Sequence, residues 1–223
     1  MERRMVIPGE LLVEGEHQLG SGVYREGNSV YASTLGLLDE KSGYVRVIPI
    51  TGKYIPTVED FVIGKVEESQ FSNWYVDINS AYTGALNAKD YFRDVDPRET
   101  DLNTILAPGD VIYAKVREIT HSKKVYITMT ERRAQVLKKG RLIDMAPVKV
   151  PRLIGKKSSM ISMITDESKC KIIVGQNGWI WMDGKPAMVD LVVRAIRRIE
   201  EEAHKSGLTD TIKKMIIEER ESI

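Results

Sequence analysis

The chain has 223 residues, a length that predicts one to three domains, and its 42% hydrophobic and 29% charged residues are typical of a folded protein with solvated faces. It contains no run of about 20 apolar residues, and its first residues are too polar for a secretory signal, so we expect neither a membrane span nor export. The single cysteine, Cys170, leaves no partner for an internal disulfide and favours a reducing compartment. We therefore expect a cytoplasmic protein.

The formal net charge is only +1, so the chain as a whole is not a polycation. Basic residues are nevertheless concentrated between Lys138 and Lys157, a segment with seven basic residues and a single acidic residue, Asp144. A basic patch on a near-neutral chain is typical of local contact with nucleic acid. A solvated linker would have the same composition, and this alternative stays open at this point.

Residues 1–55 are predicted to form a small antiparallel β-domain, because short apolar runs alternate with turn residues. The expected strands are Leu11–Val13, Val23–Tyr24, Val30–Ala32, Gly36–Leu38 and Tyr44–Ile48. Gly20-Ser21-Gly22 lacks the following helix and the lysine of a phosphate-binding loop, so we interpret it as a β-turn.

Residues 56–135 are predicted to form a small closed or nearly closed barrel, since five strands follow one another with no long helix between them. The expected strands are Phe61–Glu67, Trp74–Ile78, Thr83–Leu86, Val111–Ile119 and Val125–Thr130. The charged segment from Lys89 to Asn103 is predicted to be a surface loop.

Strand alternation sorts the barrel side chains into a core face and an outer face. We assign to the core Trp74, Val76 and Ile78 with Ile112, Ala114 and Val116. The outer face carries Tyr75, Tyr113, Lys115 and Arg117, and Lys123 lies in the turn between the last two strands. Aromatic rings beside cations can stack bases and hold phosphates of a single strand. The alternative is that the tyrosines only cover hydrophobic surface.

Residues 136–223 begin with the basic segment, and short predicted strands and helices follow it. We expect a strand at Val148–Val150, a helical turn that breaks at Gly155, and an amphipathic helix opened by Ser158 and Ser159. The later elements are strands at Lys171–Val174 and Trp179–Met182, joined by a turn at Gly175–Gly178, and helices from Pro186 to about Ser206 and from Thr209 onward.

This β-α-α-β-β-α order resembles a KH domain, a module that clamps single-stranded RNA with a G-x-x-G loop. Gly155 would let the chain approach a phosphate, and Lys156 and Lys157 would add charge without reading a base. Ser158 replaces the second glycine of the pattern and is expected to act as an N-cap, and Arg152 adds a further cation. The alternative is an ordinary solvated helix start.

The sequence contains no convincing catalytic set. His17, His121 and His204 are far apart and lack companions at metal-ligand spacing. The acids of the barrel loop, Asp94, Asp96 and Asp101, lie on one segment rather than converging from several, so a hidden metal-dependent nuclease is a weak alternative. We expect no catalytic residue, no metal and no cofactor.

The barrel resembles the OB-fold repeated in ribosomal protein S-one, on the segments Gly64-Lys65-Val66, Tyr75-Val76-Asp77, Tyr82–Leu86 and Pro108-Gly109-Asp110. Tyr75 matches the stacking aromatic of that family, and Asn87 stands where many members have a histidine. The resemblance implies a hydrogen bond to RNA from Asn87 but no second stacking ring at that position.

A β-domain, an OB barrel and a KH domain in this order resemble the KH-containing RNA-binding subunits of the archaeal exosome. Val6–Glu10, Gly20–Tyr24 and Gly175–Trp181 look like signatures of that family. The resemblance implies a multidomain α+β, non-catalytic subunit, with three copies docked through their N-terminal domains on a ring of RNase-PH-like subunits. Single-stranded RNA would pass the OB domains, and its 3′ end would enter the phosphorolytic ring. A free-standing OB/KH protein, or one associated with translation, is the alternative.

Overall fold

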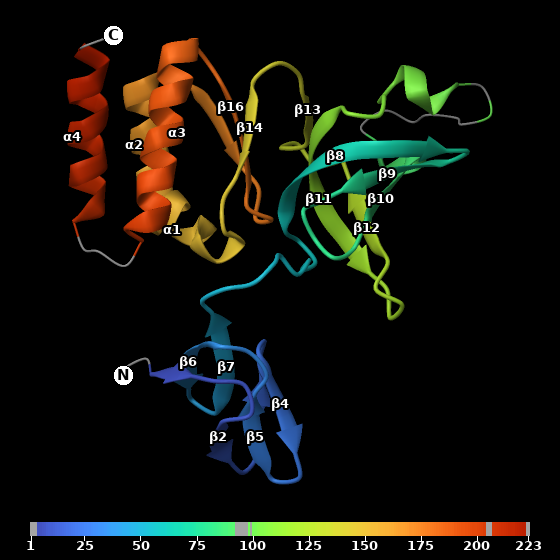
Figure 1. Ribbon diagram of the computed structural model, residues 1–223. Helices are drawn as coiled ribbons and strands as arrows, with labels where there is room; N and C mark the ends of the chain where they lie inside the picture. Colours follow the sequence, from blue (N-terminus) through green and yellow to red (C-terminus); the bar gives the residue numbers. More distant parts are fainter. Residues whose placement is uncertain (1–3, 92–97, 99, 204–206, 222–223) are drawn as a thin grey trace. The chain divides into compact units, whose positions relative to one another are not determined.

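The computed structural model describes residues 4–91, 98, 100–203 and 207–221 of the chain (Figure 1). It divides into two compact units, Met1–Gly52 and Lys53–Ile223. No helix in the described part of the chain combines the length and the apolar character that crossing a membrane requires.

The N-terminal unit consists of two small β-sheets packed around Val6, Ala32 and Val47. One sheet has the order β1 (Met5–Val6), β6 (Gly36–Lys41), β7 (Tyr44–Pro49) and β3 (Gln18–Leu19), and the other β2 (Leu11–Glu14), β5 (Ser29–Ala32) and β4 (Val23–Glu26). All five expected strands are confirmed, and the Gly20–Gly22 segment forms the turn before β4. The sequence did not indicate the two-residue strands β1 and β3.

The second unit begins with the barrel, and its five expected strands are confirmed. They are β8 (Phe61–Gln70), β9 (Asn73–Asp77), β10 (Gly84–Asn87), β11 (Val111–Ile119) and β12 (Val125–Thr128). The sheet order β12-β10-β9-β8-β11 closes through pairing of β11 with β12, and β13 (Gln135–Leu137) adds to β11. Short 3₁₀ turns lie at Ala88–Asp90 and Leu102–Thr104. The side chains predicted for the core, among them Trp74 and Ile112, have no exposed surface.

The KH part contains a three-stranded sheet of order β14-β16-β15 covered by helices (Figure 1). The strands are β14 (Arg141–Asp144), β15 (Lys171–Val174) and β16 (Trp179–Asp183). The helices are α1 (Val150–Ile154), α2 (Ser159–Ser168), α3 (Pro186–Glu201) and α4 (Leu208–Glu221), with 3₁₀ turns at Pro147–Lys149 and Lys156–Ser158. The β-α-α-β-β-α order is therefore confirmed.

The first strand of this order was placed wrongly. Pro147–Lys149 is a 3₁₀ turn and Val150 already belongs to α1, whereas the first strand is Arg141–Asp144. The physical reason is that Pro147 and Pro151 stand in the first turns of these helices, where the fixed proline φ and the missing N–H are favourable. The alternation of valine and lysine at 148–150 imitates a strand but has no partner strand to pair with among the described residues.

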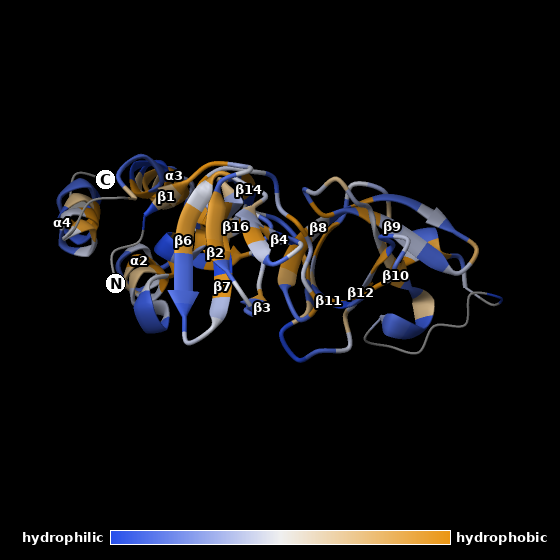
Figure 2. Ribbon diagram, turned by 90° about the horizontal axis from the view of Figure 1, so that it is seen from below, coloured by the Kyte–Doolittle hydropathy of each residue, from blue (hydrophilic) through white to orange (hydrophobic). Residues whose placement is uncertain are grey.

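The helices bury one continuous apolar face. The buried stripe of α3 consists of Met188, Leu191, Val192, Ala195, Ile196 and Ile199, and α4 contributes Leu208, Ile212 and Ile216 to the same core. In Figure 2 the hydrophobic colour of α4 lies on the side turned toward α2 and α3. The last helix therefore packs on its own chain rather than standing free.

Candidate nucleic-acid interface

The loop Gly155–Ser158 connects α1 to α2 and exposes Lys156, Lys157 and Ser158 to solvent. A Cβ on Gly155, whose φ is +75°, would lie 2.8 Å from the backbone nitrogen of Met160, so the position requires glycine. The predicted N-cap at Ser158 is wrong, because its side chain makes no capping hydrogen bond within the described part of the chain. Ser158 has φ 63°, whereas an N-cap needs extended backbone. It thus adopts the left-handed conformation that glycine takes most easily.

A pocket of about 380 Å³ opens beside this loop, between the KH part and the barrel. Its apolar lining comes from Ile154 of α1, Ile161 of α2 and the β15 residues 172–174. The barrel side contributes polar and cationic residues, namely Tyr113, Arg132, Arg133 and Gln135. Apolar side chains suit the flat face of a base, and cations at the rim suit phosphates. The arrangement therefore has the chemistry of a groove for a single strand.

On the barrel side of the groove, an arginine and two aromatic rings stack on one another. The guanidinium carbon of Arg133 lies 5.9 Å from the ring centroid of Phe61, and Phe61 stacks on Tyr113 with centroids 5.3 Å apart. Burial raises the pKa of the Tyr113 hydroxyl, and the nearby Arg133 charge offsets only part of that effect. Tyr113 is therefore neutral at physiological pH and supports the ring that carries Arg133.

Asn177 fixes the KH part against the barrel. Its side chain is fully buried, donates to the carbonyl oxygens of Ile63 (2.6 Å) and Ile78 (2.8 Å), and accepts from the N–H of Ile63 (3.2 Å). The Asn79 side chain donates to the Asn177 carbonyl at 2.9 Å. A buried amide with these bonds made holds one geometry, because losing any partner would leave a polar group unpaired. The Gly175–Gly178 turn thus anchors the KH part to Ile63 and Ile78 of the barrel.

Tyr75 and Tyr113, two of the aromatic residues predicted to contact RNA, lie far apart on the barrel. Tyr75 pairs with Glu68 on one side of β8, whereas Tyr113 pairs with Ile63 on the other side. Glu68 and Ile63 are five residues apart on β8, which is about 17 Å along a strand. Tyr75 and Tyr113 therefore belong to different surfaces, and only Tyr113 reaches the groove.

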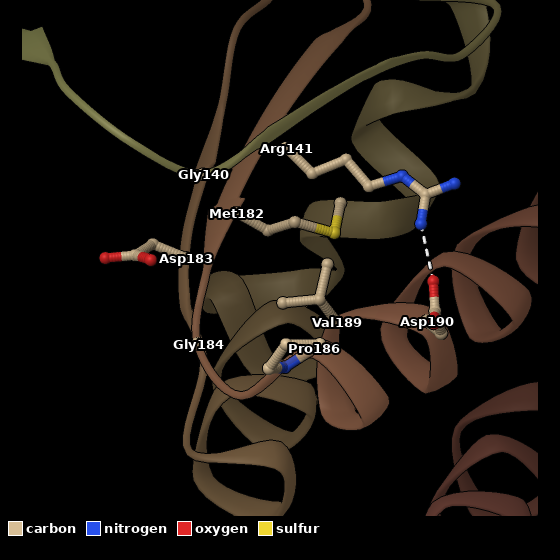
Figure 3. Close-up of a pocket in the computed structure, with 8 residues that line it drawn as sticks. All are labelled: Gly140, Arg141, Met182, Asp183, Gly184, Pro186, Val189 and Asp190. Carbon is tan, nitrogen blue, oxygen red and sulfur yellow. Dashed lines mark hydrogen bonds and ion pairs between the residues drawn. The ribbon is translucent and has the colours of Figure 1, made fainter.

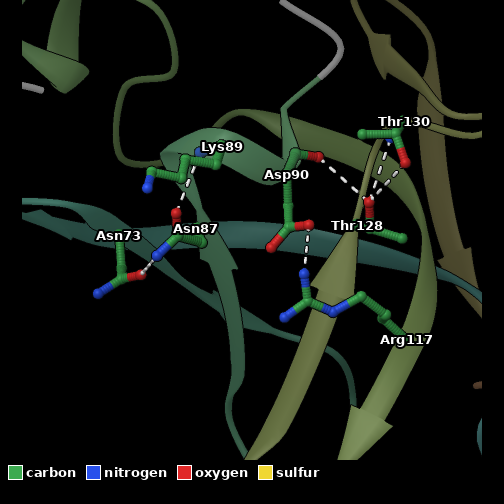
Figure 4. Close-up of polar contacts among 7 residues, drawn as sticks. All are labelled: Asn73, Asn87, Lys89, Asp90, Arg117, Thr128 and Thr130. Atoms are coloured by element: carbon green, nitrogen blue, oxygen red, sulfur yellow. Dashed lines mark hydrogen bonds and ion pairs between the residues drawn. The ribbon is translucent and has the colours of Figure 1, made fainter. Parts of the chain in front are cut away.

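The predicted barrel cations are already paired with carboxylates. The Lys115 ammonium lies 2.8 Å from Glu59 and 2.9 Å from Glu131, and the hydrogen bonds to these two groups raise its pKa. Arg117 forms an ion pair with Asp90, as Figure 4 shows. A phosphate at either side chain would have to compete with these carboxylates. Both residues lie on the outer face as expected, but neither offers an uncompensated charge.

The remaining sequence candidates lie in three places. The Asn87 amide nitrogen donates to the Asn73 side chain at 2.9 Å, and its oxygen accepts the N–H of Lys89 (Figure 4). Both polar atoms of the Asn87 side chain therefore already have a protein partner. Lys123 is exposed in the turn between β11 and β12. Arg152 is half-buried on α1, one turn before the loop. Of the sequence candidates, Ser158 and Tyr113 line the groove, and Gly155, Lys156 and Lys157 belong to the same loop as Ser158. The other barrel candidates, Tyr75, Asn87, Lys115, Arg117 and Lys123, do not line it.

Comparisons with known proteins agree with this architecture. Residues 3–51 match the family model described as the exosome RNA binding protein RRP4 N-terminal domain, and residues 140–188 match a KH domain model. The relative named exosome complex component Rrp4 from Pyrococcus furiosus is 43% identical over 96% of this chain and 83% of its own length. The one from Methanosarcina mazei is 42% identical over 99% of this chain and 84% of its own.

The chain belongs to the archaeal Rrp4 family. A crystal structure described as that of an exosome complex RNA-binding protein has the same fold, with a TM-score of 0.70 and 36% identity over 76% of this chain and 98% of that one. The family resemblance drawn from the sequence, and the fold class with its β-domain, OB-like barrel and KH domain, are confirmed.

Sequence reasoning missed the barrel side of the groove in this Rrp4-family chain. Arg132 and Arg133 lie in the turn between β12 and β13, and Gln135 begins β13. In the sequence, the proximity of Arg132 and Arg133 to the basic segment 138–157 could have indicated that they contribute to the same site. Gln135 also accepts a hydrogen bond from Lys171 at 2.9 Å, which ties β15 to β13.

A second pocket, of about 290 Å³, lies on the far edge of the KH sheet and is not suited to a phosphate (Figure 3). Two of its lining residues are the acids Asp183 and Asp190. The cation Arg141 is bonded to Asp190 at 2.5 Å. The pocket therefore offers no uncompensated positive charge from its own lining.

Among the described residues, those considered for catalysis do not come together in one cluster. Asp94, Asp96 and His204 lie outside the described residues. Asp101 accepts the N–H of Asn103 and so caps a 3₁₀ turn. Within the described residues, no group of three or more histidine, cysteine or acidic side chains is arranged to hold a metal ion.

Proposed function

We propose that this chain is the RNA-binding, non-catalytic cap subunit of an archaeal exosome, and that it captures single-stranded RNA and delivers the 3′ end to a phosphorolytic ring. Membership of the Rrp4 family supports the assignment, since relatives sharing more than 40% of its residues are named exosome components. The observation that carries the RNA-binding part is the groove between Gly155–Ser158 and Arg132–Arg133, which combines an apolar lining with a cationic rim.

In this proposal the groove holds RNA without reading its sequence. Bases would lie on Ile154, Ile161 and the β15 side chains, and phosphates would meet the exposed lysines of the loop and the arginines opposite. Contacts to phosphates and stacking on apolar surface tolerate any base. Weak specificity suits a complex that must accept many RNAs.

The N-terminal unit would dock the chain on its partners. Met5 and Ile7 are 61% and 60% exposed, and Leu11 on the neighbouring sheet is 43% exposed, so apolar surface is available there. Exposed apolar groups at the edges of small sheets are typical of protein contacts. We assign this surface to RNase-PH-like ring subunits, with three copies of the chain per ring, working in the cytoplasm.

The test is to mix the purified chain with an RNase-PH-like subunit pair from an archaeon that has a protein of the Rrp4 family. Size-exclusion chromatography with light scattering would report co-elution and copy number, and a poly(A) assay would report degradation. We expect co-elution of three copies per ring and more processive degradation. Ile7→Glu should abolish co-elution, and Ile7→Val is the matched control that should keep it. A monomer that binds RNA but ignores the ring would identify a free-standing OB/KH protein instead.

A further inference from the structure

Three residues form one row across the outer face of the barrel. Tyr75 of β9 is paired with Ala85 of β10, and Ala85 is paired with Tyr126 of β12. Residues directly opposite one another project from the same face of a sheet. Both tyrosines are partly exposed, whereas their strand neighbours Val76 and Ile127 are fully buried. The row therefore presents two aromatic rings with a single methyl group between them.

The spacing of this row fits one stacked base. Neighbouring strands are about 4.8 Å apart, so the two tyrosines, two strands apart, stand about 9.5 Å from each other. Stacked bases follow one another at about 3.4 Å, so a base held between two rings needs ring planes about 7 Å apart. The two tyrosine side chains would reach that separation by leaning toward each other over Ala85. A larger side chain at position 85 would fill the space.

The charges around the row favour a base over a phosphate. Glu68 is opposite Tyr75 and Glu118 is opposite Tyr126, so a carboxylate stands at each end. The guanidinium of Arg117 lies 6.0 Å from the Tyr126 ring centroid and is anchored by Asp90 (Figure 4). The carboxylates repel a phosphate, and the anchored arginine holds the ring of Tyr126 in place.

We infer that Tyr75, Ala85 and Tyr126 form a slot that takes one unpaired nucleobase of single-stranded RNA, stacked between the two tyrosine rings. The inference rests on the proposed function and deepens it, because it gives the barrel a contact of its own, separate from the KH groove. Asn87 cannot supply a second ring, but Tyr126, on the neighbouring strand, does. Arg117 acts as a positioning residue that supports Tyr126. Stacking tolerates every base, so the slot adds affinity without sequence preference.

The experiment uses the full chain and a series of RNA oligonucleotides that carry a single 2-aminopurine at successive positions. Stacking quenches this fluorophore, so the wild-type chain should quench it strongly at one position. Tyr126→Leu should remove that quenching and weaken binding about 5- to 140-fold, the effect of one lost base–aromatic stack. Tyr126→Phe keeps the ring and should behave as wild type. Tyr24→Leu, at an exposed tyrosine of the N-terminal unit, is the matched control and should change nothing.

Ala85→Leu separates a slot from two independent platforms. It keeps both rings but fills the space between them, so a slot should lose affinity and quenching as fully as in Tyr126→Leu, and the double variant should lose no more. Unaltered binding by Ala85→Leu would overturn the inference, provided circular dichroism shows the same melting temperature. If Lys156→Ala/Lys157→Ala weakens binding while the slot variants keep wild-type quenching, the slot is wrong and the proposed function stands. A wild-type chain that binds no RNA would overturn both.

Discussion

The KH loop offers the sharpest quantitative prediction. Lys156 and Lys157 are exposed, and neither takes part in an ion pair within the described residues. Replacing both with alanine should therefore remove contacts to two phosphates of a single strand. Each such contact contributes about 0.7 to the slope of log K against log salt, so the slope should become shallower by about 1.4. Between 50 and 200 mM salt, the double variant should lose about sevenfold less affinity than the wild-type chain.

The assay is fluorescence anisotropy with a short poly(A) oligonucleotide at several salt concentrations. The matched control is Lys213→Ala/Lys214→Ala, which removes two exposed lysines from α4, away from the groove. This control should leave the slope unchanged. A loop variant that binds more weakly with the wild-type slope would refute the reasoning, because the lysines would then act through the loop conformation and not through phosphates.

Three further predictions concern stability, and each is measured by urea unfolding. Asn177→Ala should lower the free energy of unfolding by about 3 kcal/mol, because buried groups of Ile63 and Ile78 lose their partners; a loss below 1 kcal/mol would show that water replaces the amide. Ser158→Gly should raise stability by about 0.5 kcal/mol, since it relieves the left-handed serine at some entropic cost, whereas Ser158→Val should lower it; equal effects of the two would contradict this. Burial raises the pKa of Asp60, against the opposing hydrogen bond from Tyr54, so the folded state disfavours the carboxylate and stability falls as pH rises from about 4 through the raised pKa. Asp60→Asn should remove that fall and be the more stable form at pH 7, and the same pH dependence in both proteins would refute the assignment.

The fold could be predicted largely because its local signals agree with its tertiary contacts. In β7, β9 and β11 the alternating apolar residues are the buried ones, so the sequence pattern matches the buried face of each strand. The failure at Val148–Val150 came from a segment where alternation and proline chemistry disagree. Pro147 and Pro151 favour helix starts, and the segment lacks a sheet partner among the described strands, so the helical tendency prevails.

The site was harder to predict than the fold, because its walls come from distant parts of the sequence. The loop Gly155–Ser158 carries a local motif, but Arg132 and Arg133 stand opposite it through tertiary contacts. These are the pairing of β13 with β11 and the hydrogen bonds of Asn177 that hold the KH part on the barrel. Sequence alternation put Lys115 and Arg117 on the correct face. It could not reveal that Glu59, Glu131 and Asp90 neutralise them, since those partners lie on other segments.

The distribution of charge implies two different modes of contact with RNA within one near-neutral chain. Cations beside the KH groove stand exposed, so that part would contribute most of the salt-dependent binding. The cations Lys115 and Arg117 on the outer barrel face are compensated by carboxylates, so that face would contribute mainly stacking, which salt affects little. Loop substitutions should then flatten the salt dependence, and slot substitutions should lower affinity equally at every salt concentration. Because Asn177 holds the two parts in one geometry, weakening it should reduce the benefit of binding both at once, as expected when linked contacts lose their effective concentration.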